Sequence, residues 1–186
     1  YEVSRGLVAR GYSVTIIACD THGAPAYEIH EGIRIVRISA WNPSWLNSSF
    51  PVPKPWALIS PVWRLCREDT DAIITETRFY PTTFLGLAIA FFRRIPLVHV
   101  EQGSCHPASH RRAIRIAGTF IDHTFGFLAC RGASAVIGVS AAAASFAKHL
   151  GARDIRVSVI HNPIDTGFWR PDPVSAARSG RIAIVF

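Results

Sequence analysis

The sequence contains no methionine and no long apolar run. Its 186 residues include 13 Asp and Glu against 20 Lys and Arg, which gives a formal charge of +7. Because the chain opens on Tyr1 and has no Met, we expect it to be an internal piece of a longer protein. The most apolar stretch, 84–92, is followed by Arg93-Arg94, well before the roughly 20 residues that a membrane-spanning helix needs. We therefore predict no transmembrane helix.

Several common site motifs are also absent. There is no Gly-x-x-x-x-Gly-Lys-Ser/Thr loop, no Gly-x-Gly-x-x-Gly after a strand and no Gly-x-Ser-x-Gly elbow, so no P-loop, dinucleotide site or hydrolase nucleophile is visible. The scattered cysteines form no Cys-x-x-Cys pair, which suits reduced thiols in a cytosolic protein better than a zinc ribbon or a disulfide scaffold. His106 and His110 have the spacing of two metal ligands on one helix face, but Pro107 and the lack of a following Glu break the pattern. We expect no metal site.

The basic charge balance suits an anionic partner such as a phosphate, a phospholipid surface or nucleic acid. The basic run at 110–115 could bind a phosphate or a lipid headgroup, or it could be a solvated helix face. Nucleic-acid binding favours aromatic side chains among the basic ones, and they are missing from this run. We therefore expect no nucleic-acid partner, while an anionic membrane surface stays open.

Short runs rich in Val and Ile alternate with helical patterns along the chain. Residues 1–10 show a helical stripe that Gly11 ends, and the run at 14–18 is typical of a buried strand. A helix followed by a strand is half of a βαβ unit, so we expect a further strand and a glycine loop before Tyr1. The alternation predicts an α/β fold with a Rossmann-like, doubly wound parallel sheet. Further strands are expected at 71–75, 135–140 and 155–160, a hairpin or short edge strand at 29–38, helices at 61–68, 82–94, 120–130 and 141–150, and a long surface loop at 41–61.

The stretch 96–104 lies at the centre of this pattern. Its apolar run follows a proline and stops at Gly103, which predicts a buried parallel strand. Open α/β sheets bind their ligands at the carboxyl ends of such strands. There Glu101 and Gln102 offer polar groups and Gly103 lets a ligand approach the backbone, although Gly103 could also merely end the strand. A second polar cluster, 76–81, follows the preceding strand.

Five segments share an order and spacing with a known pattern. Residues 10–16, Arg-Gly-Tyr-Ser-Val-Thr-Ile, are similar to a Leu-x-x-Arg-Gly-His-x-Val-x-Val segment, and 32–37 is similar to the hairpin that follows it. Residues 135–140 are similar to an Ala-Asp-x-Val-Ile-x-Val-Ser strand. Residues 155–165 are similar to a Val-Ile-Pro-Asn-Gly-Val-Asp hinge. Residues 181–186 are similar to the strand that opens the domain after this hinge. Taken together and in this order, they resemble family four glycosyltransferases of GT-B fold.

The resemblance implies two Rossmann-like domains that face each other across a cleft. It implies transfer of a sugar from a UDP- or GDP-sugar to a glycan or lipid acceptor, usually with retention and with no tightly bound metal or other cofactor. Residues 1–168 would be the acceptor-binding domain without its first strand, 169–180 the interdomain linker and 181–186 the start of the donor domain. The glutamates that hold the donor would lie beyond these residues, so we expect a hexosyltransferase whose present piece is inactive alone. Its expected location is the cytoplasm, or the periphery of a membrane.

The resemblance also assigns roles to residues. Gln102 stands where the family often has the histidine of Glu-His-Gly, near the transferred sugar; an amide hydrogen-bonds a sugar but does not titrate near neutral pH, so proton transfer is excluded. Arg78 could pair with a phosphate, or form a surface ion pair with Glu76. Asn162 is expected near the donor, with Pro163 in place of the family's glycine. The predicted cleft residues are Glu76, Arg78, Gln102, Gly103 and Ser104, with Gln102 as the catalytic one.

A second function class stays open at this point. The same residues would suit a non-catalytic Rossmann-like module that binds a sugar or a phosphate for assembly or regulation. A glycine-rich turn soon after residue 186, followed much later by paired glutamates, would favour the enzyme over this module.

Overall fold

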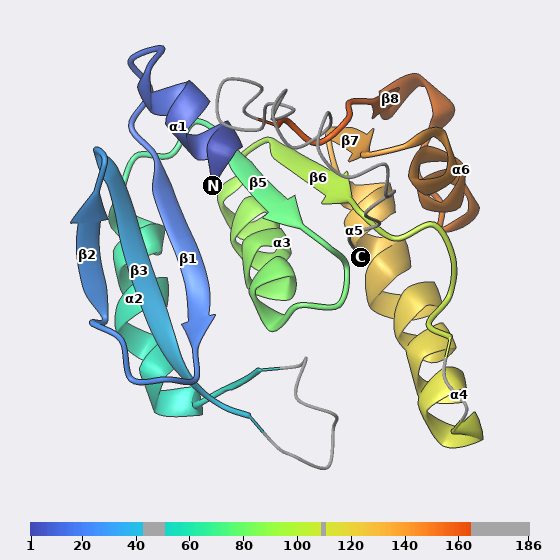
Figure 1. Cartoon of the computed structure of the whole chain (residues 1–186), viewed down its shortest axis with the longest axis horizontal. Coiled ribbons are helices and arrows are strands. Elements are labelled where there is room, and N and C mark those ends of the chain that lie inside the picture. Colours follow the sequence, from blue (N-terminus) through green and yellow to red (C-terminus); the bar gives the residue numbers. More distant parts are fainter. Residues whose placement is uncertain (43–50, 109–110, 165–186) are drawn as a thin grey trace, which may run out of the picture.

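Two β-sheets and the helices around them make up the described chain (Figure 1). The structure is a computed structural model that describes residues 1–42, 51–108 and 111–164. The N-terminal sheet is mixed, whereas the second sheet is entirely parallel. The α/β class and the parallel sheet predicted from the sequence are therefore confirmed.

The strand β3 (Ile33–Trp41) is the centre of the N-terminal sheet. It pairs in parallel with β1 (Thr15–Asp20) and antiparallel with β2 (Tyr27–His30). Its far end also pairs antiparallel with the two residues of β4 (Val52–Pro53). The mixed pairing follows from the connections, because a tight hairpin can only join antiparallel strands.

Local turn chemistry explains the first elements. The helix α1 (Glu2–Val8) is followed by Gly11, whose φ of 86° turns the chain toward β1. The hairpin between β2 and β3 turns at Glu31 and Gly32, with φ angles of 49° and 76°. Positive φ at both central residues matches the twist of the flanking strands. The hairpin expected at 29–38 is confirmed.

The second sheet has the strand order β5-β6-β7-β8. These strands are β5 (Ile73–Glu76), β6 (Leu97–Glu101), β7 (Ala135–Gly138) and β8 (Val157–Val159), and a short turn of 3-10 helix, η3 (Asp154–Arg156), leads into the last one. Each strand runs parallel to its neighbour, so all four carboxyl ends lie at one edge. This edge positions the candidate site.

The two sheets are not joined by hydrogen bonds. Within the described ranges, β1 pairs only with β3 and β5 pairs only with β6. The helix α3 (Pro81–Arg93) contacts both β1 and β5 and connects the two halves. The described chain therefore differs from one continuous doubly wound sheet, and the strand expected before Tyr1 stays a prediction.

The long loop expected at 41–61 is wrong in its second part. The helix α2 (Pro55–Arg67) begins there, with Pro55 in the first turn, where its missing N–H costs no hydrogen bond. Pro61 lies inside this helix. Contacts with β3 and α3 hold α2 in place and override the local signal of two prolines. Residues 43–50 of the expected loop lie outside the described chain.

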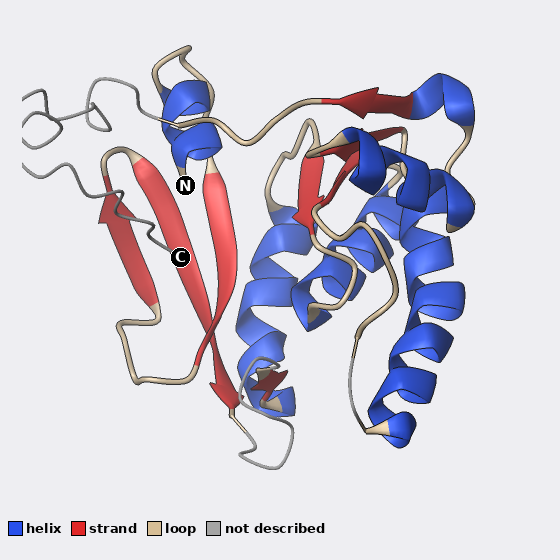
Figure 2. Cartoon of the chain, turned by 45° about the vertical axis from the view of Figure 1, so that its right-hand side comes forward, coloured by secondary structure: helices blue, strands red, loops and turns tan. Residues whose placement is uncertain are grey.

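One long helical run connects β6 to β7. It consists of α4 (Arg112–Ile121), the π-helical turn η2 (Asp122–Gly126) and α5 (Phe127–Gly132), and its α4 end extends beyond the rest of the fold (Figures 1 and 2). The run begins earlier than the helix expected at 120–130. Across the three described ranges, no helix is both long and apolar enough to cross a membrane.

The core lies between the second sheet and its helices. Leu97 on β6 and Val136 on β7 pack with Ala147 and Leu150. Ala147 belongs to α6 (Ala141–His149), which begins where the Ser140 hydroxyl accepts a hydrogen bond from the Ala143 N–H at 3.1 Å. This layer supports the strands whose carboxyl ends form the edge.

Candidate functional site

The predicted site residues gather at the carboxyl edge of the second sheet. Glu76 ends β5 and lies in register with Val100 on β6, and Gln102 follows directly after the end of β6. Glu76, Gln102 and Ser104 are exposed, and Gly103 is half-buried. Asn162 is also exposed, three residues after the end of β8. The structure therefore brings the predicted polar groups to one accessible edge, and their roles stay predictions.

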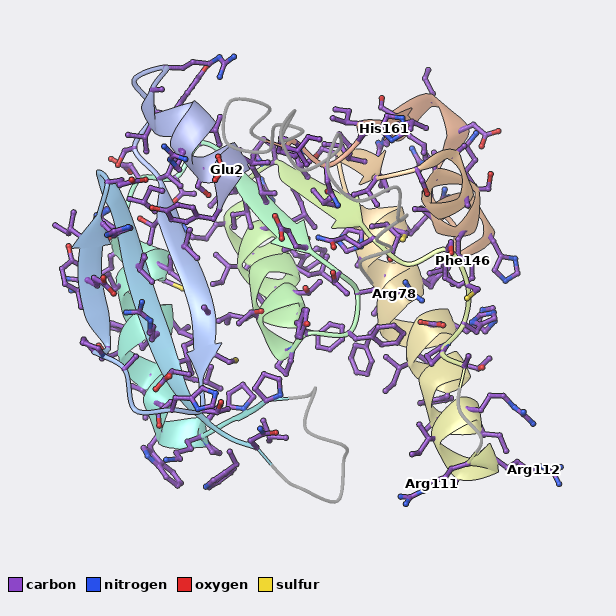
Figure 3. The ribbon with its side chains drawn as sticks, in the orientation of Figure 1. Glu2, Arg78, Arg111, Arg112, Phe146 and His161 are labelled. Carbon is purple, nitrogen blue, oxygen red and sulfur yellow. The ribbon has the colours of Figure 1, made fainter. Side chains whose placement is uncertain are left out.

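Arg78 differs from the others because its side chain is buried, with 1% exposed. Its Nε donates to Asp122 Oδ1 at 2.6 Å, its Nη1 to Glu101 Oε1 at 2.5 Å and its Nη2 to the Cys105 carbonyl at 2.8 Å. The guanidinium carbon Cζ of Arg78 lies over the Phe146 ring, 4.7 Å from the ring centre (Figure 3). The alternative of a surface ion pair with Glu76 is wrong, because Arg78 pairs inside the protein with two carboxylates.

A strained turn directs Arg78 inward. Thr77 has a φ of 60°, which is rare for a β-branched residue. Its N–H donates to the Val100 carbonyl at 2.9 Å, and its own carbonyl accepts from the Thr83 hydroxyl at 2.7 Å. These bonds hold a conformation that the chain would otherwise avoid, and strain of this kind collects at functional sites.

Glu101 fixes the loop that carries Gln102. Its Oε1 accepts from the Gly103 N–H at 2.7 Å as well as from Arg78. Burial alone raises the pKa of Glu101, but the His99 ring, the Arg78 guanidinium and the Gly103 N–H outweigh burial and hold this pKa below its ordinary value of 4.5. Glu101 is therefore a charged anchor for the loop, and its position leaves Gln102 and Ser104 outside.

Glu101→Gln is expected to reduce the loss of stability in acid. Because the folded-state pKa lies below the unfolded value, the ionised carboxylate stabilises the native state above pH 4.5, and this contribution disappears as the pH falls through the folded pKa. Denaturant unfolding at about pH 7 and about pH 3 measures the difference. We expect that difference to be smaller in the variant than in the unmodified protein. An equal difference in both proteins would contradict the role of Glu101 as a charged anchor.

Other buried polar groups lie behind Glu101. His99 Nδ1 is 3.0 Å from the Thr75 hydroxyl, and His99 Nε2 is 3.5 Å from Glu101 Oε2. Burial raises the pKa of the Cys130 thiol to about 12, and the Glu101 charge adds to the effect. This thiol stays protonated at physiological pH and is no nucleophile. These buried groups lie inside the protein, behind the exposed edge.

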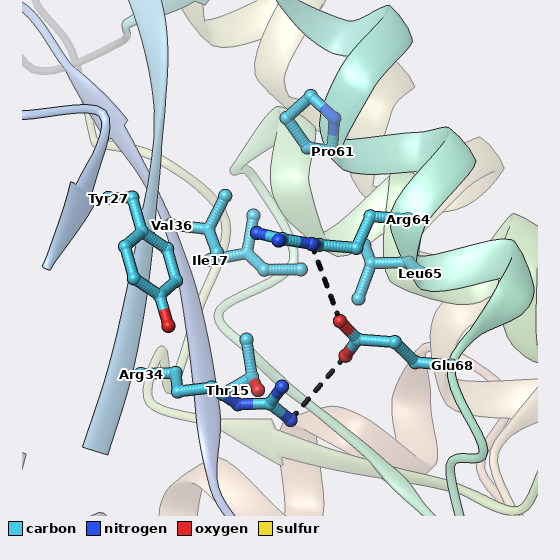
Figure 4. A pocket seen from close by; sticks show the side chains of 9 residues that line it. All are labelled: Thr15, Ile17, Tyr27, Arg34, Val36, Pro61, Arg64, Leu65 and Glu68. Carbon is cyan, nitrogen blue, oxygen red and sulfur yellow. Dashed lines mark ion pairs between the residues drawn. The ribbon is translucent and has the colours of Figure 1, made fainter. Parts of the chain in front are cut away.

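Neither of two hollows in the structure lies at this edge. Nine residues between the N-terminal sheet and α2 line a cavity of about 10 Å³, where Glu68 faces Arg34 and Arg64 at 3.5 Å each (Figure 4). That space holds about one water molecule. An open depression of about 680 Å³ lies at the amino end of β6, around Ala90 and Pro96. The candidate site is thus an exposed edge and not one of these hollows.

Sequence reasoning missed Asp122 as a partner of Arg78. The two residues are 44 positions apart, and no local pattern joins them. The available signal was a single acidic residue between the apolar Ile121 and Phe125 of the expected helix. Buried acids of this kind need a cation or several hydrogen-bond donors, and the structure supplies both.

The family model for Glycosyltransferase Family 4 matches residues 1–168. The chain belongs to this family. A glycosyltransferase of Methanocaldococcus jannaschii, described as uncharacterized, is 26% identical to this family 4 domain over 162 residues, which cover 83% of the chain and 40% of the relative. The family resemblance seen in the sequence is confirmed.

Solved structures share the fold of this family 4 domain. HepE of Anabaena in complex with UDP and glucose is 17% identical, with a TM-score of 0.53 over 89% of this chain and 48% of HepE. The complex of HepE with UDP-glucose gives 17% identity and a TM-score of 0.51 over 88% of this chain and 48% of HepE. At this identity the likeness shows the fold alone. The chain spans less than half the length of the relatives that it matches.

Proposed function

We propose that the full-length protein transfers a hexosyl group from a UDP- or GDP-sugar to an acceptor with retention, and that this chain supplies the acceptor side of the cleft. Family membership supports transfer of a sugar. Solved structures of HepE contain UDP with glucose or UDP-glucose, which favours a nucleotide-sugar donor. The observation that carries the proposal is the exposed loop 102–104, held by a buried pair of Arg78 and Glu101 at the carboxyl edge.

The geometry divides the work between exposed and buried residues. The amide of Gln102 is placed to hydrogen-bond a sugar hydroxyl, and it cannot transfer a proton near neutral pH. Gly103 lets the loop lie directly against the buried pair, since a Cβ at this position would lie 2.5 Å from Arg78 Nη1. Arg78 acts here as a positioning residue, because it is buried and each of its three nitrogens donates to a protein acceptor, namely Asp122, Glu101 and the Cys105 carbonyl. Stabilisation of an oxocarbenium-like transition state and of the leaving diphosphate would come from the whole two-domain cleft.

An exposed edge suits a site that a facing domain completes. Asn162 lies on the way to that domain and is proposed to approach the donor.

The acceptor is a glycan or a lipid, and the helix α4 supports contact with an anionic membrane surface on the cytoplasmic side. It exposes Arg112 and Arg115 together with Ile116 and Phe120, and its tip lies far from the core (Figure 3). No tightly bound metal is proposed for the transfer step itself.

Gln102→Ala is expected to lower kcat/KM for sugar transfer about tenfold in the full-length protein, because a hydrogen bond to the sugar is lost. A tenfold change in rate corresponds to about 1.4 kcal/mol. Calorimetry and nucleotide release with a panel of UDP- and GDP-sugars first identify the donor, and transfer is then measured for each variant. Ser145→Ala, on an exposed position of α6, is the matched control. Unchanged turnover in Gln102→Ala would remove this residue from the site. If no donor binds the folded full-length protein, the non-catalytic sugar- or phosphate-binding module replaces the enzyme.

A further inference from the structure

Three histidines from separate parts of the chain meet on the surface of the second half. His106 lies in the loop after β6, His123 in η2 and His149 at the end of α6. The ring centre of His106 lies 5.1 Å from that of His123 and 5.6 Å from that of His149. The ring centres of His123 and His149 are also 5.6 Å apart. One ring nitrogen of each lies within 4.8 Å of the others. We name these residues the histidine triangle.

A buried carboxylate orients one corner of the triangle. His106 Nδ1 lies 2.6 Å from Asp122 Oδ2, and the carboxylate makes Nδ1 the protonated nitrogen. The lone pair of His106 Nε2 is then free to bind a metal ion. Carboxylates that accept from the second ring nitrogen are typical partners of metal-binding histidines.

The surroundings of the triangle favour a cation. His149 is the last residue of α6, where the helix dipole is negative. The Phe146 ring packs at 5.1 Å from His106 and 5.7 Å from His149, and it forms an apolar wall on one side. His123 and His149 are exposed, so an ion can reach their rings from solvent. Zn–N bonds of 2.0–2.1 Å in a tetrahedral site need nitrogens about 3.3 Å apart, so the ring nitrogens, now within 4.8 Å of one another, would have to move closer on binding.

We propose that His106, His123 and His149 bind one divalent transition-metal ion, with Zn²⁺ as the best match for three imidazole nitrogens and an open fourth position. The ion would clamp the loop after β6 onto η2 and α6. That loop begins with Gln102 and is also held by Arg78, which shares Asp122 with His106. The clamp is separate from the sugar-transfer chemistry and does not depend on it.

This proposal replaces the expectation of no metal near His106. That expectation paired His106 with His110, which lies outside the described residues. The partners in the structure are instead 17 and 43 positions further along the chain, at His123 and His149. Sequence spacing on one helix could not identify a site built by three different elements.

The test uses the full-length protein without a polyhistidine tag, freed of metal by a chelator. Calorimetric titration with Zn²⁺ and the visible absorption of added Co²⁺ report binding and ligand geometry. We expect an equivalent of Zn²⁺ to bind at the triangle and the Co²⁺ spectrum to show tetrahedral coordination. His123→Gln and His149→Gln should each weaken this binding at least tenfold, while His22→Gln, an exposed histidine elsewhere, should leave it unchanged.

Thermal unfolding gives a second readout that is independent of sugar transfer. Zn²⁺ should raise the Tm of the unmodified protein and of His22→Gln, and it should have no such effect on His123→Gln or His149→Gln. Absence of Zn²⁺ binding by the folded protein would overturn the proposal. Equal binding in all variants would do the same, and the triangle would then be a set of stacked neutral imidazoles only.

Discussion

Replacing Arg78 by alanine is expected to lower the free energy of unfolding by about 3 to 5 kcal/mol. The Arg78 side chain is 1% exposed and pairs with both Glu101 and Asp122, which are fully buried. Without it, two like charges remain in the interior with no cation beside them. The Cys105 carbonyl also loses its donor, so the loop 102–105 keeps the Gly103 hydrogen bond to Glu101 but loses its second support. We therefore expect at least a tenfold loss of the proposed transfer activity in the full-length protein.

Denaturant unfolding monitored by fluorescence measures the stability change. Arg64→Ala is the matched control, because Arg64 is 58% exposed and lies 3.5 Å from Glu68, so its loss should change stability by less than about 1 kcal/mol. Arg78→Lys keeps the charge but cannot reach three acceptors at once, and it should fall between the alanine variant and the unmodified protein. If Arg78→Ala and Arg64→Ala proved equally stable, the buried pairing described above would be refuted.

Gly138→Ala is expected to destabilise the fold by about 1 to 3 kcal/mol or more. A Cβ at this position would lie 2.3 Å from the Ala144 nitrogen and 2.6 Å from its Cα. These are backbone atoms in the first turn of α6, which cannot rotate away as a side chain would. The strand β7 and the helix α6 must therefore move apart, and the contact between Val136 and Ala147 in the core weakens.

The midpoint of thermal unfolding measures this effect. Gly6→Ala is a control for which we expect no loss of stability. Gly6 lies inside α1, and its added Cβ meets only the flexible end of Arg10 at 3.4 Å. Alanine in a helix interior is favoured over glycine by about 0.5 to 1 kcal/mol. We expect a lower Tm for Gly138→Ala and an equal or higher Tm for Gly6→Ala. A Tm for Gly138→Ala that matches the unmodified protein would show that the strand and the helix are not in close contact.

Local signals predicted most of the fold. The glycines after α1 and in the hairpin mark turns that need positive φ, and the apolar runs mark the strands of the second sheet. Where local chemistry and tertiary contacts disagreed, the prediction failed. Pro55 and Pro61 indicated a loop, but packing against β3 and α3 keeps 55–67 helical.

The candidate site was predictable only in outline. The end of a buried strand at Gly103 indicates an edge, and the edge is where Gln102 and Ser104 are exposed. The inward direction of Arg78 was not predictable, since it depends on one strained φ at Thr77 and on an acid 44 positions away. Long-range pairs of this kind leave no periodic signal in the sequence.

The π-helical turn η2 sets the rotation of α4 about its axis relative to α5. An α-helix rotates by about 100° per residue, and a π-helical turn contains more residues than an α-helical one. Shortening η2 by a single residue would therefore twist α4 against α5 by about a quarter of a revolution. Ile116 and Phe120 would then face another direction, while Cys130 stayed in the core. In an alignment of related chains, single-residue length differences at 122–126 would mark members whose outer helix points its apolar stripe elsewhere.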